Sequence, residues 1–273
     1  MTKLSKHRPS SFRGIADSLV AARAQGRNLR LFPGLLPVGL EDAYAIQAQA
    51  IELMQYDIAG WKVGRLTPAL ADRFGTDRFI GPVFSTLVEN VDGRVENDFP
   101  VYPGGSAAFE AEYVAILGDD QPAVTREFTP QSARMIIGDL RIGIEIAGSP
   151  LAAMPDLDSL ASIADLGNNN GQIIGPAVPV DLLDQPTLMT CATSIDGSLV
   201  RAGNAADLPG GPLEAIAFAL SQAAKLGRPL RAGQFISTGA VTGMHWIGIG
   251  QRCVADFGPW GRIRCLSVPI GRA

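Results

Sequence analysis

Short apolar runs separated by turn-forming residues fill most of this chain and constrain its fold more than any other feature. They follow the segment "GWKVG" (60–64) and recur as "FEAEYVAIL", "IGIEIAG", "GQIIGPAV", "TLMTCATSID", "GQFISTG" and "RIRCLSVPI". Runs of this length, bounded by Gly, Pro, Asn and Asp, are typical of β-strands. The sequence therefore predicts a body rich in β-sheet, mixed but mostly antiparallel.

A helical pattern precedes this body. Apolar residues spaced by three and four positions occur in 12–26 and in 40–55, which predicts two helices. Further helices are predicted at 211–227, where Pro212 suits the first turn and Gly227 the C-terminal end, and at 130–140. The expected fold class is α+β, with a helical N-terminal subdomain at 1–70 and a β-rich domain at 71–273.

Two segments near the C-terminus need separate interpretation. Residues 232–251 are free of charge and long enough to raise the question of a membrane span, but they contain five glycines and several polar side chains. Two short buried strands with turns fit this segment better. Residues 252–265 alternate around a Gly-Pro-Trp-Gly turn and predict a hairpin, with Cys253 and Cys265 on opposite arms.

Composition excludes some partners and indicates a compartment. The net charge is -4 and no run of basic residues offers a surface for phosphates, so nucleic acid is not an expected partner, and neither is a membrane. The chain starts without an apolar leader and has three cysteines, Cys191, Cys253 and Cys265. We therefore expect a cytoplasmic protein whose cysteines are small buried apolar residues rather than a disulfide framework.

The strand "SAAFEAEYVAIL" (106–117) carries two acidic side chains on one face. Side chains alternate across a strand, so Glu110 and Glu112 point the same way, about 6.6 Å apart along it. Two carboxylates about 4 Å apart repel by about 4 kcal/mol at an effective dielectric of 20, and convergence would require a positive charge between them. The alternative is an edge strand that exposes both glutamates to water.

A third carboxylate favours convergence. In "RIGIEIAG" (141–148), Glu145 shares a face with Gly143 and Ala147, and small neighbours suggest the floor of a crevice. The chain has only two histidines: His7 lies near the N-terminus, and we interpret His245 as a core or pocket-wall residue. Three carboxylates with few nitrogen or sulfur ligands favour a hard divalent cation, Mg²⁺ or Mn²⁺, over zinc.

The order of several motifs resembles a known family across nearly the whole chain. The motifs are "DAYAIQ" (42–47), "GWKVG" (60–64), "FEAE" (109–112), "IEIAG" (144–148), "ADLGNNNGQIIG" (164–175) and "LRAGQFISTGA" (230–240). Together they resemble the hydratase and decarboxylase branch of the fumarylacetoacetate hydrolase superfamily. The resemblance implies that superfamily's β-rich catalytic fold, a small-molecule 2-oxo acid substrate, a bound Mg²⁺ or Mn²⁺, and a homo-oligomer.

The resemblance also assigns roles to individual residues. Glu110, Glu112 and Glu145 match the metal ligands of the family, and Lys62 matches a lysine kept near the substrate. Without the resemblance, Lys62 would be interpreted as a solvated surface lysine. The other residues that it implies are Asp165 and Asp77 as catalytic groups, and Thr238, Gly239 and Asn168 as substrate contacts. Asp165 and Asn168 also suit simple turn chemistry, as Thr238 and Gly239 suit a strand end.

Departures from the family pattern leave the substrate open. Arg78 and Phe79 replace an expected Pro-Asp pair, so Asp77 is carried over only weakly, and Gln234 replaces an aspartate. Residues 149–171 contain no lysine, which argues against hydrolysis of a C–C bond. The resemblance implies a lyase that adds water to a 2-hydroxydienoate in aromatic catabolism. Alternatives are a 2-oxo acid decarboxylase, a C–C hydrolase, the same chemistry on a bulkier substrate beside Phe79 and Trp246, or a non-catalytic metabolite-binding protein.

Overall fold

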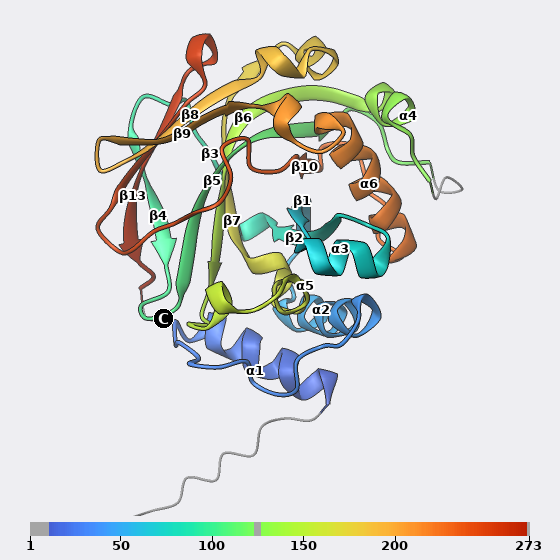
Figure 1. Cartoon of the computed structure of the whole chain (residues 1–273), viewed down its shortest axis with the longest axis vertical. Helices are drawn as coiled ribbons and strands as arrows, with labels where there is room; N and C mark the ends of the chain where they lie inside the picture. The colour runs from blue at the N-terminus through green and yellow to red at the C-terminus, as the bar shows by residue number, and fades with distance from the viewer. Residues whose placement is uncertain (1–10, 123–126, 272–273) are drawn as a thin grey trace, which may run out of the picture.

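The computed structural model describes residues 11–122 and 127–271, which form two mixed sheets and six α-helices within those ranges. The larger sheet curves through the molecule, and the smaller one lies at one side of it (Figure 1). Both contain antiparallel and parallel pairs, with antiparallel pairs in the majority. The predicted α+β class with a mostly antiparallel β-rich body is confirmed.

The larger sheet has eight strands in the order β2-β1-β10-β5-β6-β7-β3, with β11 also paired to β5. Among the described strands of this sheet, the β1–β10 and β3–β7 pairs are parallel and the others antiparallel. The long central strands β5 and β6 are covered on both faces, so few of their side chains reach solvent. The strands are β1 (Ile58–Arg65), β2 (Arg78–Phe84), β3 (Val88–Asn90), β5 (Ser106–Leu117), β6 (Ile137–Ser149), β7 (Asn169–Val178), β10 (Phe235–Ser237) and β11 (His245–Trp246).

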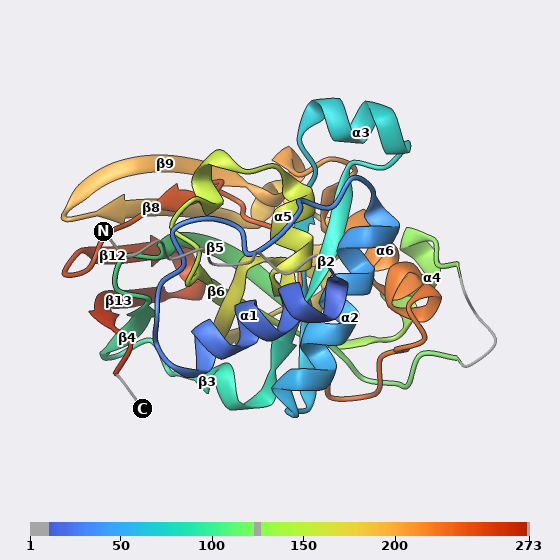
Figure 2. The ribbon, with the colours of Figure 1, turned by 90° about the horizontal axis from the view of Figure 1, so that it is seen from below.

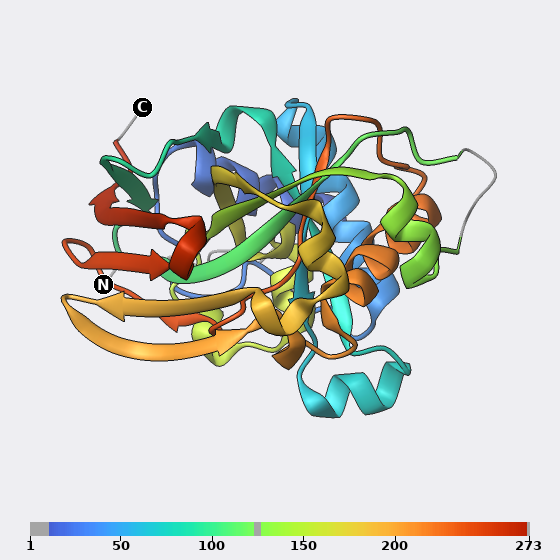
Figure 3. The ribbon, with the colours of Figure 1, turned by 90° about the horizontal axis from the view of Figure 1, so that it is seen from above.

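The smaller sheet has five strands in the order β4-β13-β12-β8-β9. Figure 3 shows β8 and β9 side by side with β12 and β13. The predicted hairpin is confirmed, because β12 and β13 are antiparallel and Cys253 lies opposite Cys265, both buried and free. The strands are β4 (Glu96–Val101), β8 (Thr190–Ile195), β9 (Ser198–Asn204), β12 (Arg252–Asp256) and β13 (Arg262–Pro269).

Helices cover the larger sheet and one end of the molecule. Figure 2 shows α1 and α2 packed side by side, and α5 packs on α2. α6 packs against β1 and β2, and α4 packs on α6. The helices are α1 (Phe12–Ala24), α2 (Leu40–Met54), α3 (Pro68–Phe74), α4 (Pro130–Met135), α5 (Ser159–Ala164) and α6 (Gly211–Lys225).

The helix predictions at 12–26, 40–55 and 211–227 are confirmed by α1, α2 and α6. Local signals explain their ends. Ser11 accepts a hydrogen bond from the backbone of Gly14 at the start of α1, and Gly227 has a φ of 73° just after α6. Residues 232–251 contain the short strands β10 and β11 with turns, as predicted. No helix in the described ranges is both long and apolar enough to cross a membrane.

The helix predicted at 130–140 is wrong beyond Met135, because β6 begins at Ile137. A Cβ on Gly138 would lie 2.8 Å from the Cα of Gly118, so this glycine allows two backbones to approach closely where the strand enters the sheet. Pairing with β5 therefore overrides the helical pattern. The proposed boundary at residue 70 stays a prediction, although β1 precedes it in sequence and belongs to the larger sheet.

An apolar loop of residues 31–39, which precedes α2, is only partly packed. Phe32 is buried, whereas Leu31, Leu35 and Val38 are exposed. The exposed apolar side chains of this loop could contact another copy of the chain. The expected homo-oligomer stays a prediction.

Candidate metal centre

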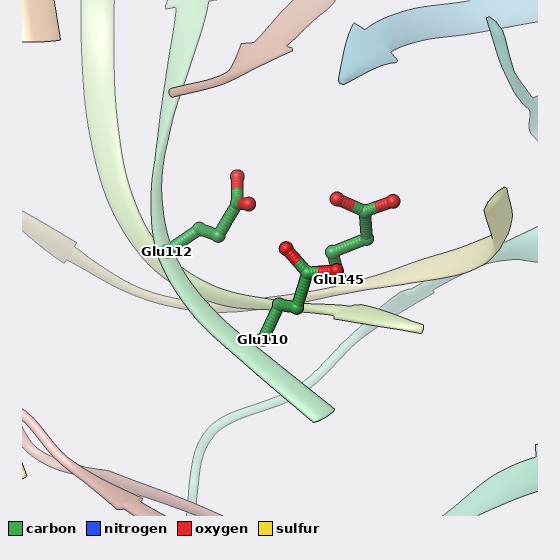
Figure 4. A group of neighbouring side chains, drawn as sticks. All are labelled: Glu110, Glu112 and Glu145. Atoms are coloured by element: carbon green, nitrogen blue, oxygen red, sulfur yellow. The ribbon is translucent and has the colours of Figure 1, made fainter. Parts of the chain in front are cut away.

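The three glutamates predicted as ligands lie together inside the larger sheet. Glu110 is directly opposite Glu145 in the β5–β6 ladder, and Glu112 is opposite Gly143. One carboxylate oxygen from each glutamate lies within 4.8 Å of the others, and Figure 4 shows the side chains converging from the two strands. Glu110 is 8% exposed and the other two are fully buried, so the edge-strand alternative is wrong.

Lys62 brings a positive charge to this cluster from the neighbouring part of the sheet. Its Nζ lies 3.1 Å from Glu145 Oε1 and 5.5 Å from the centre of the Phe79 ring. The side chain is buried, so the solvated-lysine interpretation is wrong. Burial disfavours the charged ammonium, but the nearby charges of Glu145, Glu110 and Glu112 outweigh burial and raise the pKa of Lys62. Lys62 therefore remains charged at neutral pH.

Burial and mutual repulsion raise the pKa of the three carboxyl groups above the ordinary value of a glutamate. Burial is the largest cause and raises the pKa of Glu110, Glu112 and Glu145 to about 7 each, with their own negative charges adding to the effect. Lys62 lowers all three pKa values. Without a cation, the cluster therefore holds protons at a pH where surface glutamates do not.

Several carboxylate oxygens already have protein partners. Glu112 Oε2 accepts hydrogen bonds from Ser237 Oγ and from the backbone N–H of Gly239, the latter at 2.9 Å. Glu145 Oε1 accepts one from Asn169 Nδ2 at 3.1 Å. These contacts fix the side chains in place.

Other oxygens of the cluster lack partners. Glu112 Oε1 and Glu145 Oε2 are buried, and no group within 11–122 and 127–271 donates a hydrogen bond to them. Buried carboxylate oxygens without donors are costly unless a cation or water satisfies them. Three carboxylates beside one ammonium leave a formal charge of -2 when all are ionised, and a divalent cation neutralises that charge. The residues present therefore fit a divalent metal ion.

A cavity of about 450 Å³ opens above this cluster. Lys62 and Glu110 lie in its wall beside Asn168, Thr238 and Gly239, so part of the predicted constellation surrounds one space. The remaining wall is largely apolar and includes Phe79, Met154, Leu157, Leu208, Met244 and Trp246.

The predicted substrate contacts occupy this wall in different ways. Thr238 Oγ1 donates to the backbone oxygen of Tyr113 at 3.0 Å, and the Gly239 N–H is donated to Glu112. These two donors therefore already have partners within the protein. Asn168 is different, because its buried Oδ1 has no hydrogen-bond partner in the described structure.

The loop that carries Asn168 is held by close backbone packing. Gly167 has a φ of 74°, and a Cβ on Gly81 of β2 would lie 2.6 Å from the Gly167 Cα. Both positions therefore require glycine, one for its conformation and the other for the close approach. This packing brings Asn168 to the cavity.

The two aspartates predicted as catalytic lie outside the cavity wall. Asp165 is buried and pairs with Arg23 of α1, whose Nη2 lies 3.0 Å from Asp165 Oδ1, and it also accepts a hydrogen bond from Ser149 Oγ. Asp77 has a side chain that is 43% exposed and pairs with Arg78, which does line the cavity. Neither aspartate is brought to the carboxylate cluster.

The sequence analysis did not single out some residues that shape the site. Ser237 directly precedes Thr238 in the sequence. Its position at the end of the strand predicted there was the available signal that it lies at the site. Arg23 gave no signal, because 142 residues separate it from Asp165. His245 is half-buried, with Nε2 3.3 Å from Thr242 Oγ1, and is absent from the carboxylate cluster; His7 lies outside the described residues.

Comparison with known proteins defines the family. Residues 87–266 match the family described as fumarylacetoacetate (FAA) hydrolase C-terminal, and this range is more than half of the chain. The chain therefore belongs to that family. The match covers all three glutamates and Thr238, whereas Lys62 lies before it.

The chain is similar in sequence to a hydratase and in fold to a decarboxylase. A 2-keto-4-pentenoate hydratase of Burkholderia vietnamiensis is 28% identical over 261 residues, which cover 93% of this chain and 97% of the relative. The solved 4-oxalocrotonate decarboxylase from Pseudomonas putida G7, complexed with magnesium and adipate, has a TM-score of 0.75 at 18% identity and covers 96% of this chain and 100% of that chain.

A more distant structure has a different activity. The fumarylpyruvate hydrolase from Pseudomonas aeruginosa, in complex with Mn²⁺ and pyruvate, has a TM-score of 0.56 at 18% identity, with 78% of this chain and 91% of that chain covered. At such identities the two structures show that the fold is shared.

The Arg23–Asp165 pair generates a stability prediction. Asp165→Asn should lower the free energy of unfolding by about 3–5 kcal/mol, because it leaves the buried Arg23 guanidinium without its carboxylate. The double variant Arg23→Met/Asp165→Leu should recover most of that loss. Urea unfolding monitored by circular dichroism measures both, with the exposed Asp92→Asn as control. A loss no greater than that of Asp92→Asn would contradict a structural role for the pair.

The raised pKa of Glu110 predicts a pH-dependent difference in the metal-free protein. Folding a carboxyl whose pKa rises from 4.5 to about 7 contributes stability below pH 4.5, and that contribution is lost as the pH rises through 7. Glu110→Gln does not titrate, so its stability relative to wild type should increase between pH 5 and pH 8, by on the order of 2 kcal/mol. Urea midpoints in EDTA test this, and a difference independent of pH would refute it.

Proposed function

We propose that this protein is a divalent-metal-dependent lyase that adds water to a 2-hydroxydienoate or the corresponding 2-oxo-alkenoate. The observation that carries the proposal is the buried cluster of three glutamates, two of which have an oxygen without a hydrogen-bond partner in the described residues. Glu110 of this cluster lies with Lys62 in the wall of a cavity. Family membership supports an enzyme of this class, and the hydratase relative supports the reaction. Fold alone would not select a reaction.

Glu110, Glu112 and Glu145 would hold the metal ion, with Mg²⁺ or Mn²⁺ preferred because all three ligands are carboxylate oxygens. When bound, the ion stabilises negative charge on the 2-oxygen of a 2-oxo acid. The related decarboxylase and hydrolase structures contain magnesium and Mn²⁺ respectively, which supports an ion of this kind.

Lys62 would hold positive charge near the 2-oxo group throughout the reaction. Its Nζ lies 3.1 Å from Glu145 Oε1, and this contact favours the charged ammonium and fixes its position. A charged ammonium in a buried site stabilises developing negative charge more strongly than it would in water. Lys62 is therefore assigned to charge stabilisation rather than to proton removal.

Glu110 would transfer the proton of the attacking water. It faces the cavity, and a carboxylate in the cavity wall can accept a proton from water and return it to the substrate. A 2-hydroxypentadienoate first ketonises, with its enol proton moving to C5. Water then adds across the C3–C4 double bond: its oxygen bonds to C4, and the proton that Glu110 takes from it goes to C3, so Glu110 ends as it began. This role suits Glu110 better than Asp165, which is held by Arg23 away from the cavity.

Asn168 and Thr238 would contact the substrate from the cavity wall, with the unpartnered Asn168 Oδ1 as the stronger candidate. Phe79 and Trp246 form apolar parts of the same wall. A cavity of about 450 Å³ lies within the usual range for small-molecule sites and leaves room for a group larger than a five-carbon acid carries. The proposal therefore includes substrates with a bulkier apolar end.

The test is a substrate panel with added Mg²⁺ or Mn²⁺. The wild-type protein should consume 2-hydroxypenta-2,4-dienoate with a mass gain of one water. Glu110→Gln should lower kcat/KM by about 10²-fold or more, because it removes both a ligand and the proton acceptor. The exposed Glu89→Gln is the matched control and should retain wild-type activity.

The same panel separates the alternatives. Loss of carbon dioxide from 4-oxalocrotonate, without hydration, would replace the hydratase assignment with a decarboxylase. Cleavage of fumarylpyruvate would indicate a hydrolase. Binding of 2-oxo acids without any turnover would leave a metabolite-binding protein and overturn the enzymatic proposal.

A further inference from the structure

Gln172 of β7 extends the row of polar residues that contains the carboxylates. It lies opposite Glu145 in the β6–β7 ladder, and Glu145 lies opposite Glu110 in the β5–β6 ladder. Residues directly opposite in antiparallel strands point to the same face of the sheet. Gln172 therefore shares the face that carries the proposed metal ligands.

The carboxamide of Gln172 is fully buried and, in the part of the chain that the structure describes, neither its nitrogen nor its oxygen has a hydrogen-bond partner. Buried amides are almost always bonded, since an unsatisfied one is destabilising. Gln121, which is also buried, differs in that both polar atoms of its carboxamide are hydrogen-bonded. Its nitrogen donates to the backbone of Leu220, and its oxygen accepts from the backbone of Leu230. Gln172 thus requires a partner that residues 11–122 and 127–271 do not supply.

The position of the amide indicates where that partner lies. A Cβ on Gly143 would be 3.0 Å from Gln172 Nε2, so the amide lies over the glycine that faces Glu112 across the sheet. Glu112 Oε1 and Glu145 Oε2 also lack partners on this face. Beyond them Val114 and Ile174 form a small apolar cluster with Val83 and Phe235, which offers no hydrogen bonds.

A water molecule suits these unsatisfied atoms. A carboxamide offers two donors and one acceptor, and a carboxylate oxygen offers only an acceptor, so water can bond to both. Water ligands of metal ions are commonly oriented by hydrogen bonds from residues just outside the coordination shell. We propose that Gln172 is a positioning residue of the metal centre, whose carboxamide holds a water molecule shared with Glu112 and the bound ion. This inference rests on the proposed metal-dependent function.

The test replaces Gln172 by methionine, which keeps the side-chain length and removes both hydrogen-bonding atoms. Titration calorimetry with MgCl₂ should show affinity weakened by about 10- to 100-fold. The Tm of the metal-free protein in EDTA should stay the same or rise, because an unsatisfied buried amide is removed. A glutamine with a purely structural role would show the reverse, a lower Tm with unchanged affinity for Mg²⁺.

Two further variants complete the design. Gln172→Glu restores an acceptor oxygen and should bind Mg²⁺ at least as tightly as wild type. Gln121→Met removes a buried glutamine whose amide nitrogen and oxygen both have hydrogen-bond partners, so it should lower Tm without altering the affinity. If Gln172→Met does not fold, Gln172→Leu provides the same comparison.

The outcomes separate this inference from the function on which it rests. Wild-type protein that binds neither Mg²⁺ nor Mn²⁺ would refute the proposed metal site itself. Wild-type protein that binds Mg²⁺, with equal affinity in Gln172→Met, would overturn only the role of Gln172.

Discussion

Mutual repulsion among three buried carboxylates is the constraint on which the rest of this structure depends. At separations of about 4 Å, each pair of ionised carboxylates repels by about 4 kcal/mol at an effective dielectric of 20. Lys62 offsets one of the three charges through its contact with Glu145, while Ser237 and the Gly239 N–H bond to Glu112. The remaining formal charge of -2 requires protons or a divalent cation, and the pKa values near 7 are the metal-free response to that requirement.

The arrangement of the larger sheet brings these groups together. Strand β10 lies between β1 and β5, so it joins the strand of Lys62 to the strand of Glu110 and Glu112 and supplies the donors at their meeting point. Gly143, opposite Glu112, has no side chain, so Val114 and Gln172 pack directly over it. The Arg23–Asp165 pair, with the hydrogen bond from Arg23 to the backbone oxygen of Asn169, ties α1 to the start of β7 beside Asn168. A rigid frame of this kind can hold like charges close together when no ion is present.

The acidic cluster is predictable from the sequence because side chains two residues apart on a strand point to the same face. Glu110 and Glu112 share a face by alternation alone, and Glu145 stands out between small neighbours. Contacts across the fold were not predictable in this way: the Lys62–Glu145 contact depends on the order of strands, and the Arg23–Asp165 pair joins residues 142 positions apart. The helix predicted at 130–140 failed beyond Met135 for a related reason, since pairing of β6 with β5 overrides local pattern. Lys62 was predicted as a site residue only from the family resemblance, because a lysine without that resemblance is interpreted as solvent-exposed.

The most direct test of the central claim is a crystal structure of the protein grown with Mn²⁺ and measured at a wavelength where manganese scatters anomalously. The account predicts one strong anomalous peak among the carboxylates of Glu110, Glu112 and Glu145, within about 2.0–2.3 Å of an oxygen from each. Ordered density for the three glutamates without such a peak, at saturating Mn²⁺ and pH 8, would contradict it.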